Sequence, residues 1–266
     1  MNDAFEEVEK IIVNYIAVVR EELAARWKAW PIDLSKPEVN EVVGALLARQ
    51  VTLATQLASS PGVWNDHTAP IVLRSMADVH IALAWILKDP LARSRQFILY
   101  GLGQAKLMLE HRKAQLAEDG KVVDDDPAVQ ASEAWINTQR FTFLTEVDVG
   151  SWSELTVREM AKEAGCLDFY RYSYTPFSGA VHSMWQHVSR FNLQMCKNPL
   201  HRYHKTPIDP NLDPDPHYLY LAAKYAQKSF NLFDKTFSVR PEGPSAFDVL
   251  NEAVEKLGAS RPRADS

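Results

Sequence analysis

An arginine and an aspartate stand four residues apart inside a stretch that is otherwise largely apolar. Arg74 and Asp78 interrupt the segment 69–87, and this spacing places both side chains on one face of a helix. A buried charge must be paired, so we expect these two residues to form an ion pair. The guanidinium of Arg74 has five donors, so further acceptors from another helix are predicted beside the pair.

A second group of polar residues repeats at the same spacing. Tyr170, Tyr174, Ser178 and His182 follow one another at intervals of four, which makes a drifting polar line if the chain stays roughly helical past Pro176. We expect this line to face Arg74 and Asp78 in one half-buried network that could bind an anionic ligand or catalyse a reaction. The alternative is that the network only fixes the register of the helices. The predicted catalytic residues are Arg74, Asp78, His80 and His182, and the predicted substrate-binding residues are Tyr170, Tyr174 and Ser178.

The elements that must position these residues are predicted to be helices. Glycine is sparse, and prolines follow good N-cap residues where helices begin. Two capping boxes are predicted, at Ser35 with Glu38 and at Thr156 with Glu159. No strand pattern competes with this interpretation. Helices are predicted over residues 3–29, 36–59, 68–88, 90–117, 127–147, 156–164, 168–174, 176–197, 216–237 and 245–257.

The fold class that follows is all-α, a single-domain bundle of about ten helices. We expect residues 1–257 to form this domain and residues 258–266 to form a flexible tail. Residues 198–216 are rich in proline and aspartate, and they are predicted to form a long loop that is functional or mobile.

Composition limits the classes of function. The net charge of -5 argues against a protein that coats nucleic acid through bulk positive charge. It does not exclude a local basic groove. Two cysteines are too few for a disulfide framework, and the first residues lack the pattern of a secretory signal. The expected location is the cytoplasm. Arg74 and Asp78 make a membrane span costly, so we expect residues 69–87 to be a central buried helix and no membrane partner.

The order of these residues resembles a family of bacterial all-helical proteins that is known only as a domain of unknown function. The likeness covers about residues 70–195 and includes Trp152 between the two polar groups. In that family a glutamate is more usual where this chain has Asp78. The resemblance implies an all-helical fold and a cytoplasmic bacterial origin, and it implies no substrate.

A looser resemblance links the chain to HEPN-type helical proteins, whose ribonuclease members carry an arginine followed by four to six residues and a histidine. Arg74 and His80 satisfy that spacing. The resemblance implies metal-independent RNA cleavage, with the histidine moving protons and the arginine stabilising charge on phosphorus. It also implies roles in stress or phage defence. A homodimer interface would let RNA reach both residues, although their separation turns them about 240° apart on one helix.

Other motifs are weaker. Residues 155–165 resemble the start of a helix-turn-helix, but the following residues are mainly aromatic, so DNA is not an expected partner. The histidines and aspartates of the 198–216 loop fit no recognised ligand set, and no metal or other cofactor is expected. The sequence therefore predicts a helical protein with a polar pocket that acts as a metal-independent ribonuclease. The alternative is a non-catalytic helical interaction module, with DNA binding through a helix-turn-helix as a third candidate.

Overall fold

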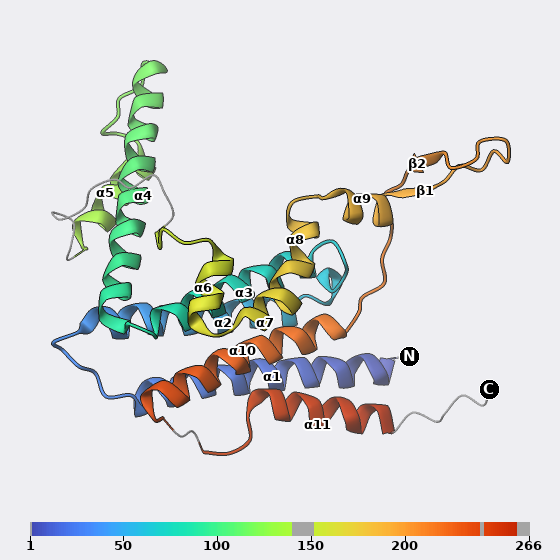
Figure 1. The fold of residues 1–266 in the computed structure, drawn as a ribbon, viewed down its shortest axis with the longest axis horizontal. Helices are drawn as coiled ribbons and strands as arrows, with labels where there is room; N and C mark the ends of the chain where they lie inside the picture. Colours follow the sequence, from blue (N-terminus) through green and yellow to red (C-terminus); the bar gives the residue numbers. More distant parts are fainter. Residues whose placement is uncertain (1, 140–151, 240–241, 260–266) are drawn as a thin grey trace.

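The computed structural model describes residues 2–139, 152–239 and 242–259, and Figure 1 shows their arrangement. Within these ranges the chain is built from helices and one short hairpin, which confirms the predicted all-α class. The strands of the hairpin are β1 (Leu193–Met195) and β2 (Lys205–Pro207). The helices are α1 (Asn2–Ala29), α2 (Pro37–Ala58), η1 (Pro61–Val63), α3 (Ala69–Ile86), α4 (Pro90–Glu118), α5 (Pro127–Asn137), α6 (Val157–Ala164), α7 (Leu167–Phe169), the π-helix η3 (Tyr170–Tyr174), α8 (Thr175–Val181), α9 (Trp185–Phe191), α10 (His217–Phe237) and α11 (Ala246–Ala259).

Helix α3 lies at the centre of the main hydrophobic core. It packs against α2 and α10 on one side and against α6, η3 and α8 on another. Its length and hydropathy alone would suit a membrane span, but 61% of it is buried inside the protein. Leu73, Met76 and Ile81 are fully buried on different faces of α3. This agrees with the expected central helix.

Helices α1, α10 and α11 form a layer beneath this centre (Figure 1). The buried guanidinium of Arg26 joins them, because its Nε and Nη2 atoms donate to the carboxylate of Asp234 at 2.9 and 2.8 Å. Arg26 also forms an ion pair with Glu22, whose other oxygen accepts from the backbone N–H of Ala246. One ionic network therefore fixes the register of three helices.

The predicted helix starts are mostly confirmed by the chain's local chemistry. Asp126 caps α5, because its carboxylate accepts from two backbone N–H groups of the first turn. Thr156 and Glu159 form the predicted capping box of α6. The box predicted at Ser35 is wrong, because the Ser35 hydroxyl donates to Asp33 and Lys36 is the N-cap of α2.

The outer half of α4 and α5 form an arm that projects from the body (Figure 1). A small separate cluster of buried residues holds the arm together, made of Leu109, Leu116, Val129 and Ile136. The helix predicted over 127–147 ends at Asn137, and residues 140–147 lie outside the described ranges. Residues 260–266 of the predicted tail lie outside them as well.

The chain between Leu167 and Pro207 departs most from prediction. The helix predicted over 168–174 is a short α7 followed by a π-helix, and the helix predicted over 176–197 is split into α8 and α9. The break lies at Ser183, whose φ of 48° is left-handed. The prediction of no strand is wrong, because β1 and β2 pair antiparallel with Gln194 opposite Thr206. Cross-strand bonds therefore replace helical ones after Phe191, and part of the expected loop becomes a hairpin.

Candidate functional site

Arg74 is the centre of a polar network between α3 and the η3–α8 segment. Its Nη1 atom pairs with the carboxylate of Asp78, and its Nε atom donates to the hydroxyl of Ser178 at 3.3 Å. The guanidinium also lies over the ring of Tyr174, with Cζ 3.0 Å from the ring centroid. Tyr170 stacks on Tyr174 at 4.7 Å between centroids. The structure therefore brings together five of the predicted site residues.

The network is buried at one end and open at the other. The Arg74 side chain is 11% exposed, whereas that of Asp78 is 46% exposed. Burial lowers the pKa of Arg74 and raises the pKa of Asp78, while the attraction between them opposes both shifts. The Ser178 hydroxyl donates back to the carbonyl of Tyr174, which holds the start of α8 against η3. Asp78 and Ser178 thus bond Arg74 through two of its nitrogens while the Tyr174 ring covers its face, which suits a residue that fixes packing.

His182 does not join this network. Helix α8 ends at Val181, and His182 has a non-helical backbone with φ −100° and ψ 10°. Its side chain is exposed, and the described part of the chain shows no hydrogen bond from it to Arg74 or Asp78. The expectation that a line of four residues would continue to His182 therefore fails, because the helix stops one residue too early.

His80 is a core histidine. Its side chain is 2% exposed, Nδ1 lies 3.0 Å from the hydroxyl of Ser229 on α10, and the ring packs edge-on against Phe169. Burial, with a smaller contribution from the charge of Lys228, lowers the pKa of His80 to about 3. A neutral, enclosed imidazole cannot supply a proton to a substrate, so the geometry argues against His80 as the partner of Arg74 in catalysis.

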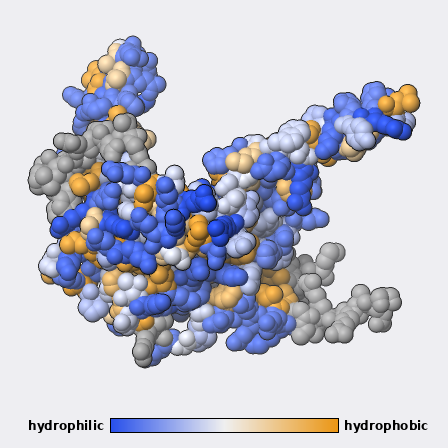
Figure 2. Space-filling model, in the orientation of Figure 1, coloured by the Kyte–Doolittle hydropathy of each residue, from blue (hydrophilic) through white to orange (hydrophobic). Residues whose placement is uncertain are grey.

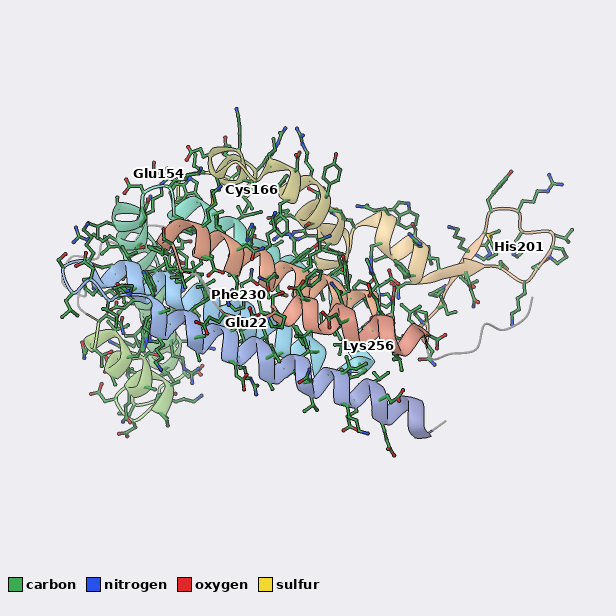
Figure 3. The ribbon with its side chains drawn as sticks, turned by 90° about the horizontal axis from the view of Figure 1, so that it is seen from below. Glu22, Glu154, Cys166, His201, Phe230 and Lys256 are labelled. Atoms are coloured by element: carbon green, nitrogen blue, oxygen red, sulfur yellow. The ribbon has the colours of Figure 1, made fainter. Side chains whose placement is uncertain are left out.

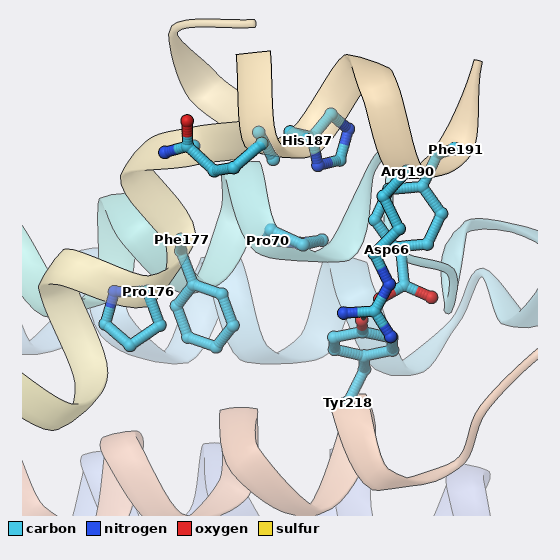
Figure 4. A pocket seen from close by; sticks show the side chains of 11 residues that line it. Asp66, Pro70, Pro176, Phe177, His187, Arg190, Phe191 and Tyr218 are labelled. Atoms are coloured by element: carbon cyan, nitrogen blue, oxygen red, sulfur yellow. Dashed lines mark hydrogen bonds between the residues drawn. The ribbon is translucent and has the colours of Figure 1, made fainter. Parts of the chain in front are cut away.

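A pocket that the sequence did not reveal lies on another side of α8. It encloses about 230 Å³ between α8, α9, the segment before α3 and the first turn of α10 (Figure 4). Apolar side chains form part of its wall, among them Pro70, Phe177 and Phe191. The polar side chains are Asp66, Gln186, His187, Arg190 and Tyr218.

Two histidines meet at the edge of this pocket. Nδ1 of His67 lies 3.2 Å from Nε2 of His187, and Phe191 packs against both rings. Burial and the neighbouring His67 lower the pKa of His187, while Asp66 opposes this shift. His187 therefore favours its neutral form, which is the form that accepts a proton.

Arg190, Asp66 and Tyr218 complete the polar side of the pocket. The Tyr218 hydroxyl donates to the carboxylate of Asp66 at 2.9 Å, and the pKa of Tyr218 is raised by burial and by that carboxylate. Figure 4 shows the Arg190 guanidinium turned toward Asp66 and Tyr218. Arg190 and His187 therefore supply a cation and a proton acceptor beside one hollow, and the carboxylate of Asp66 there is already bonded by the Tyr218 hydroxyl.

The sequence carries one signal that could have located this region. Residues 169–208 contain no aspartate or glutamate, and we call them the acid-free segment. Its Lys and Arg side chains are all exposed, at Arg171, Arg190, Lys197, Arg202 and Lys205. In a chain of net charge -5, this segment is a local concentration of positive charge. Figure 2 shows its hairpin standing out from the body, hydrophilic along most of its length.

Residues 40–198 match the family described as Family of unknown function (DUF5677). The chain belongs to this family. The match confirms the resemblance to a domain-of-unknown-function family, and it includes both polar sites except Tyr218. The DUF5677 segment runs from α2 to β1, so α1, α10 and α11 lie outside it. No curated protein and no solved structure matches the chain.

Proposed function

We propose that this protein binds single-stranded RNA through the acid-free segment and cleaves it, without a metal ion, in the pocket beside His187. The observation that carries this proposal is the contact of His67 with His187 at the edge of a hollow that His187 and Arg190 line. This is the activity that the sequence predicts, but the residues proposed to carry it are His187 and Arg190 instead of Arg74 and His80.

Charge and aromatic side chains support RNA as the ligand. Within the described ranges, Arg190, Lys197, Arg202 and Lys205 form no ion pair, so their charge is available to phosphates. Large aromatic side chains of the same segment are also exposed, including Trp185 at 70% and Tyr203 at 90%. Bases of a single strand stack on such rings. In a duplex the bases already stack on one another, so exposed rings favour a single strand.

The chemistry needs one proton carrier and one cation. In RNA the 2′-oxygen attacks the adjacent phosphorus while its proton passes to Nε2 of His187, after that atom has parted from the N–H of His67. The bond from phosphorus to the 5′-oxygen then breaks, and that oxygen takes the proton back from the imidazole. The products are a 2′,3′-cyclic phosphate and a 5′-hydroxyl. Arg190 would stabilise the charge on the phosphoryl oxygens, and His67 would act as a positioning residue for His187.

The test is an incubation of the full chain with end-labelled single-stranded RNA in the presence of a chelator. Cleavage is expected with wild type and should fall by about 100-fold or more in His187→Ala and Arg190→Ala. The matched controls are His111→Ala and Arg20→Ala, whose side chains are exposed on α4 and α1. The same RNA with 2′-O-methyl groups should stay intact. No cleavage by wild type, or cleavage indifferent to His187, would refute the proposal.

A non-catalytic interaction module is the second candidate, and the Arg74 network favours it. Asp78, Ser178 and Tyr174 surround this arginine with partners from within the chain, as expected for a residue that clamps α8 onto α3. RNA that is bound through the acid-free segment and recovered uncut would support this candidate.

A further inference from the structure

Three side chains of the hairpin that could bind a metal converge near its end. Cys196 directly follows β1, and His201 and His204 lie in the turn before β2. One ligand atom from each residue can be chosen so that all lie within 4.8 Å of one another. Figure 3 shows His201 in the hairpin, away from the helical body.

The backbone of the hairpin explains why these residues meet. Met195 pairs with Lys205, so the next position along the ladder sets Cys196 opposite His204, and the N–H of Cys196 donates to the carbonyl of His204 at 2.9 Å. Two further turns fold the intervening chain back, because the N–H of His201 donates to Asn198 and the N–H of His204 donates to His201. The convergence is therefore a property of the backbone register.

The side-chain distances fit a borderline-soft ion. Sγ of Cys196 lies 3.7 Å from Nδ1 of His201. In a tetrahedral zinc site a sulfur and a nitrogen ligand lie about 3.5 Å apart. The rings of His201 and His204 have centroids 5.4 Å apart. Only a small closure of the turn would thus bring all three ligands around one ion.

Asn198 holds the ligands in place. Its backbone N–H donates to Sγ of Cys196 at 3.5 Å, a contact that stabilises a thiolate. Its side-chain nitrogen lies 3.2 Å from Nε2 of His201, which leaves Nδ1 of that ring turned toward the sulfur.

We propose that Cys196, His201 and His204 form a zinc-type metal site at the end of the β1–β2 hairpin. One thiolate and two imidazoles select Zn²⁺ and related transition metals over Ca²⁺ or Mg²⁺, which require oxygen ligands. The neighbouring Lys197, Arg202 and Lys205 repel any cation, so the affinity must come from the thiolate and imidazole bonds. Because His201 and His204 are exposed, a water or a group from a ligand can take the fourth position.

The site can be tested with Co²⁺ as the probe, added to the full chain kept reduced by a thiol-free reductant. One Co²⁺ per chain should bind and give a thiolate-to-cobalt charge-transfer band. Cys196→Ser should remove that band, and His201→Ala and His204→Ala should each weaken binding by about 10-fold or more. Zn²⁺ should displace the Co²⁺ in wild type.

Matched controls separate this site from other thiols and from the pocket. Cys166→Ser removes the other cysteine of the chain and should bind Co²⁺ like wild type. His187→Ala should do the same, so metal binding and RNA cleavage can fail independently. No thiolate band in wild type, or a band that Cys196→Ser retains, would overturn the metal site.

Discussion

Nδ1 of His67 lies 3.2 Å from Nε2 of His187, although 120 residues separate them in the chain. The other ring nitrogen of His67, Nε2, is buried and has no hydrogen-bond partner within the described residues. A proton on that atom is costly, so a neutral His67 that donates from Nδ1 is favoured. A charged pair would place an N–H on that buried atom, so the two histidines stay neutral while they remain in contact.

The first prediction concerns the pKa of His187. Burial and His67 lower it, so His187 should titrate below the ordinary value of 6.5, and His67→Ala should move its pKa upward. Proton-detected NMR titration of the imidazoles measures both values, with the exposed His111 as an internal reference. A pKa that is unmoved by the loss of His67 would show that the two rings are not coupled. RNA cleavage through His187 should likewise persist to lower pH than cleavage through an ordinary histidine would.

The second prediction concerns acid stability and His80. Its pKa is about 3 in the folded chain and near 6.5 when unfolded, so the unfolded state binds more protons between these values. The contribution of His80 to the free energy of unfolding is fully present above pH 6.5. It is lost as the pH drops toward 3, and the loss is up to about 5 kcal/mol. Denaturant unfolding at a series of pH values measures this slope.

His80→Asn is the matched variant for that experiment. It should be less stable than wild type at pH 7, because the contacts with Ser229 and Phe169 change, yet it should lose less stability on acidification. If the variant and wild type lose stability in parallel, another group is responsible for the acid sensitivity.

The third prediction concerns Tyr203, which is 90% exposed in the turn of the hairpin. If bases stack on it, Tyr203→Ala should weaken binding of single-stranded RNA by about 5- to 100-fold. Trp135→Ala, an exposed aromatic of α5 on the opposite arm, is the control and should bind like wild type. Fluorescence anisotropy at two salt concentrations measures the affinity, which should fall as salt rises. Equal loss in both variants would argue against a specific stacking site.

The sequence predicts most helices well where proline and capping residues mark their starts. Three helix starts are predicted to within one residue of those observed, from Pro90, Pro127 and Thr156. This succeeds because the N-cap and N1 positions have strict local requirements. The same local signals gave the Arg74–Asp78 pair, since a spacing of four is fixed by helix geometry.

The parts that the sequence did not predict depend on distant contacts. A helix was expected to continue through His182 to residue 197, but the left-handed Ser183 and the pairing of β1 with β2 overrule the local preference. His67 and His187 meet only because α8 and α9 fold back over the start of α3. No spacing in the sequence predicts this contact. The acid-free segment is the one sequence feature that points to the region.

The last prediction compares Arg74 with His182, which the sequence placed in one network. Arg74→Ala should destabilise the fold by about 2–4 kcal/mol, because it leaves Asp78 unpaired and removes contacts with Ser178 and Tyr174. His182→Ala should change stability by less than about 0.5 kcal/mol, because its side chain is exposed. Chemical denaturation of the two variants beside wild type measures this contrast. Arg74→Met keeps the volume of the side chain and should restore part of the loss if packing contributes. Equal effects of Arg74→Ala and His182→Ala would mean that Arg74 is not a clamp between α3 and α8, and a functional role for the Arg74 network would then gain support.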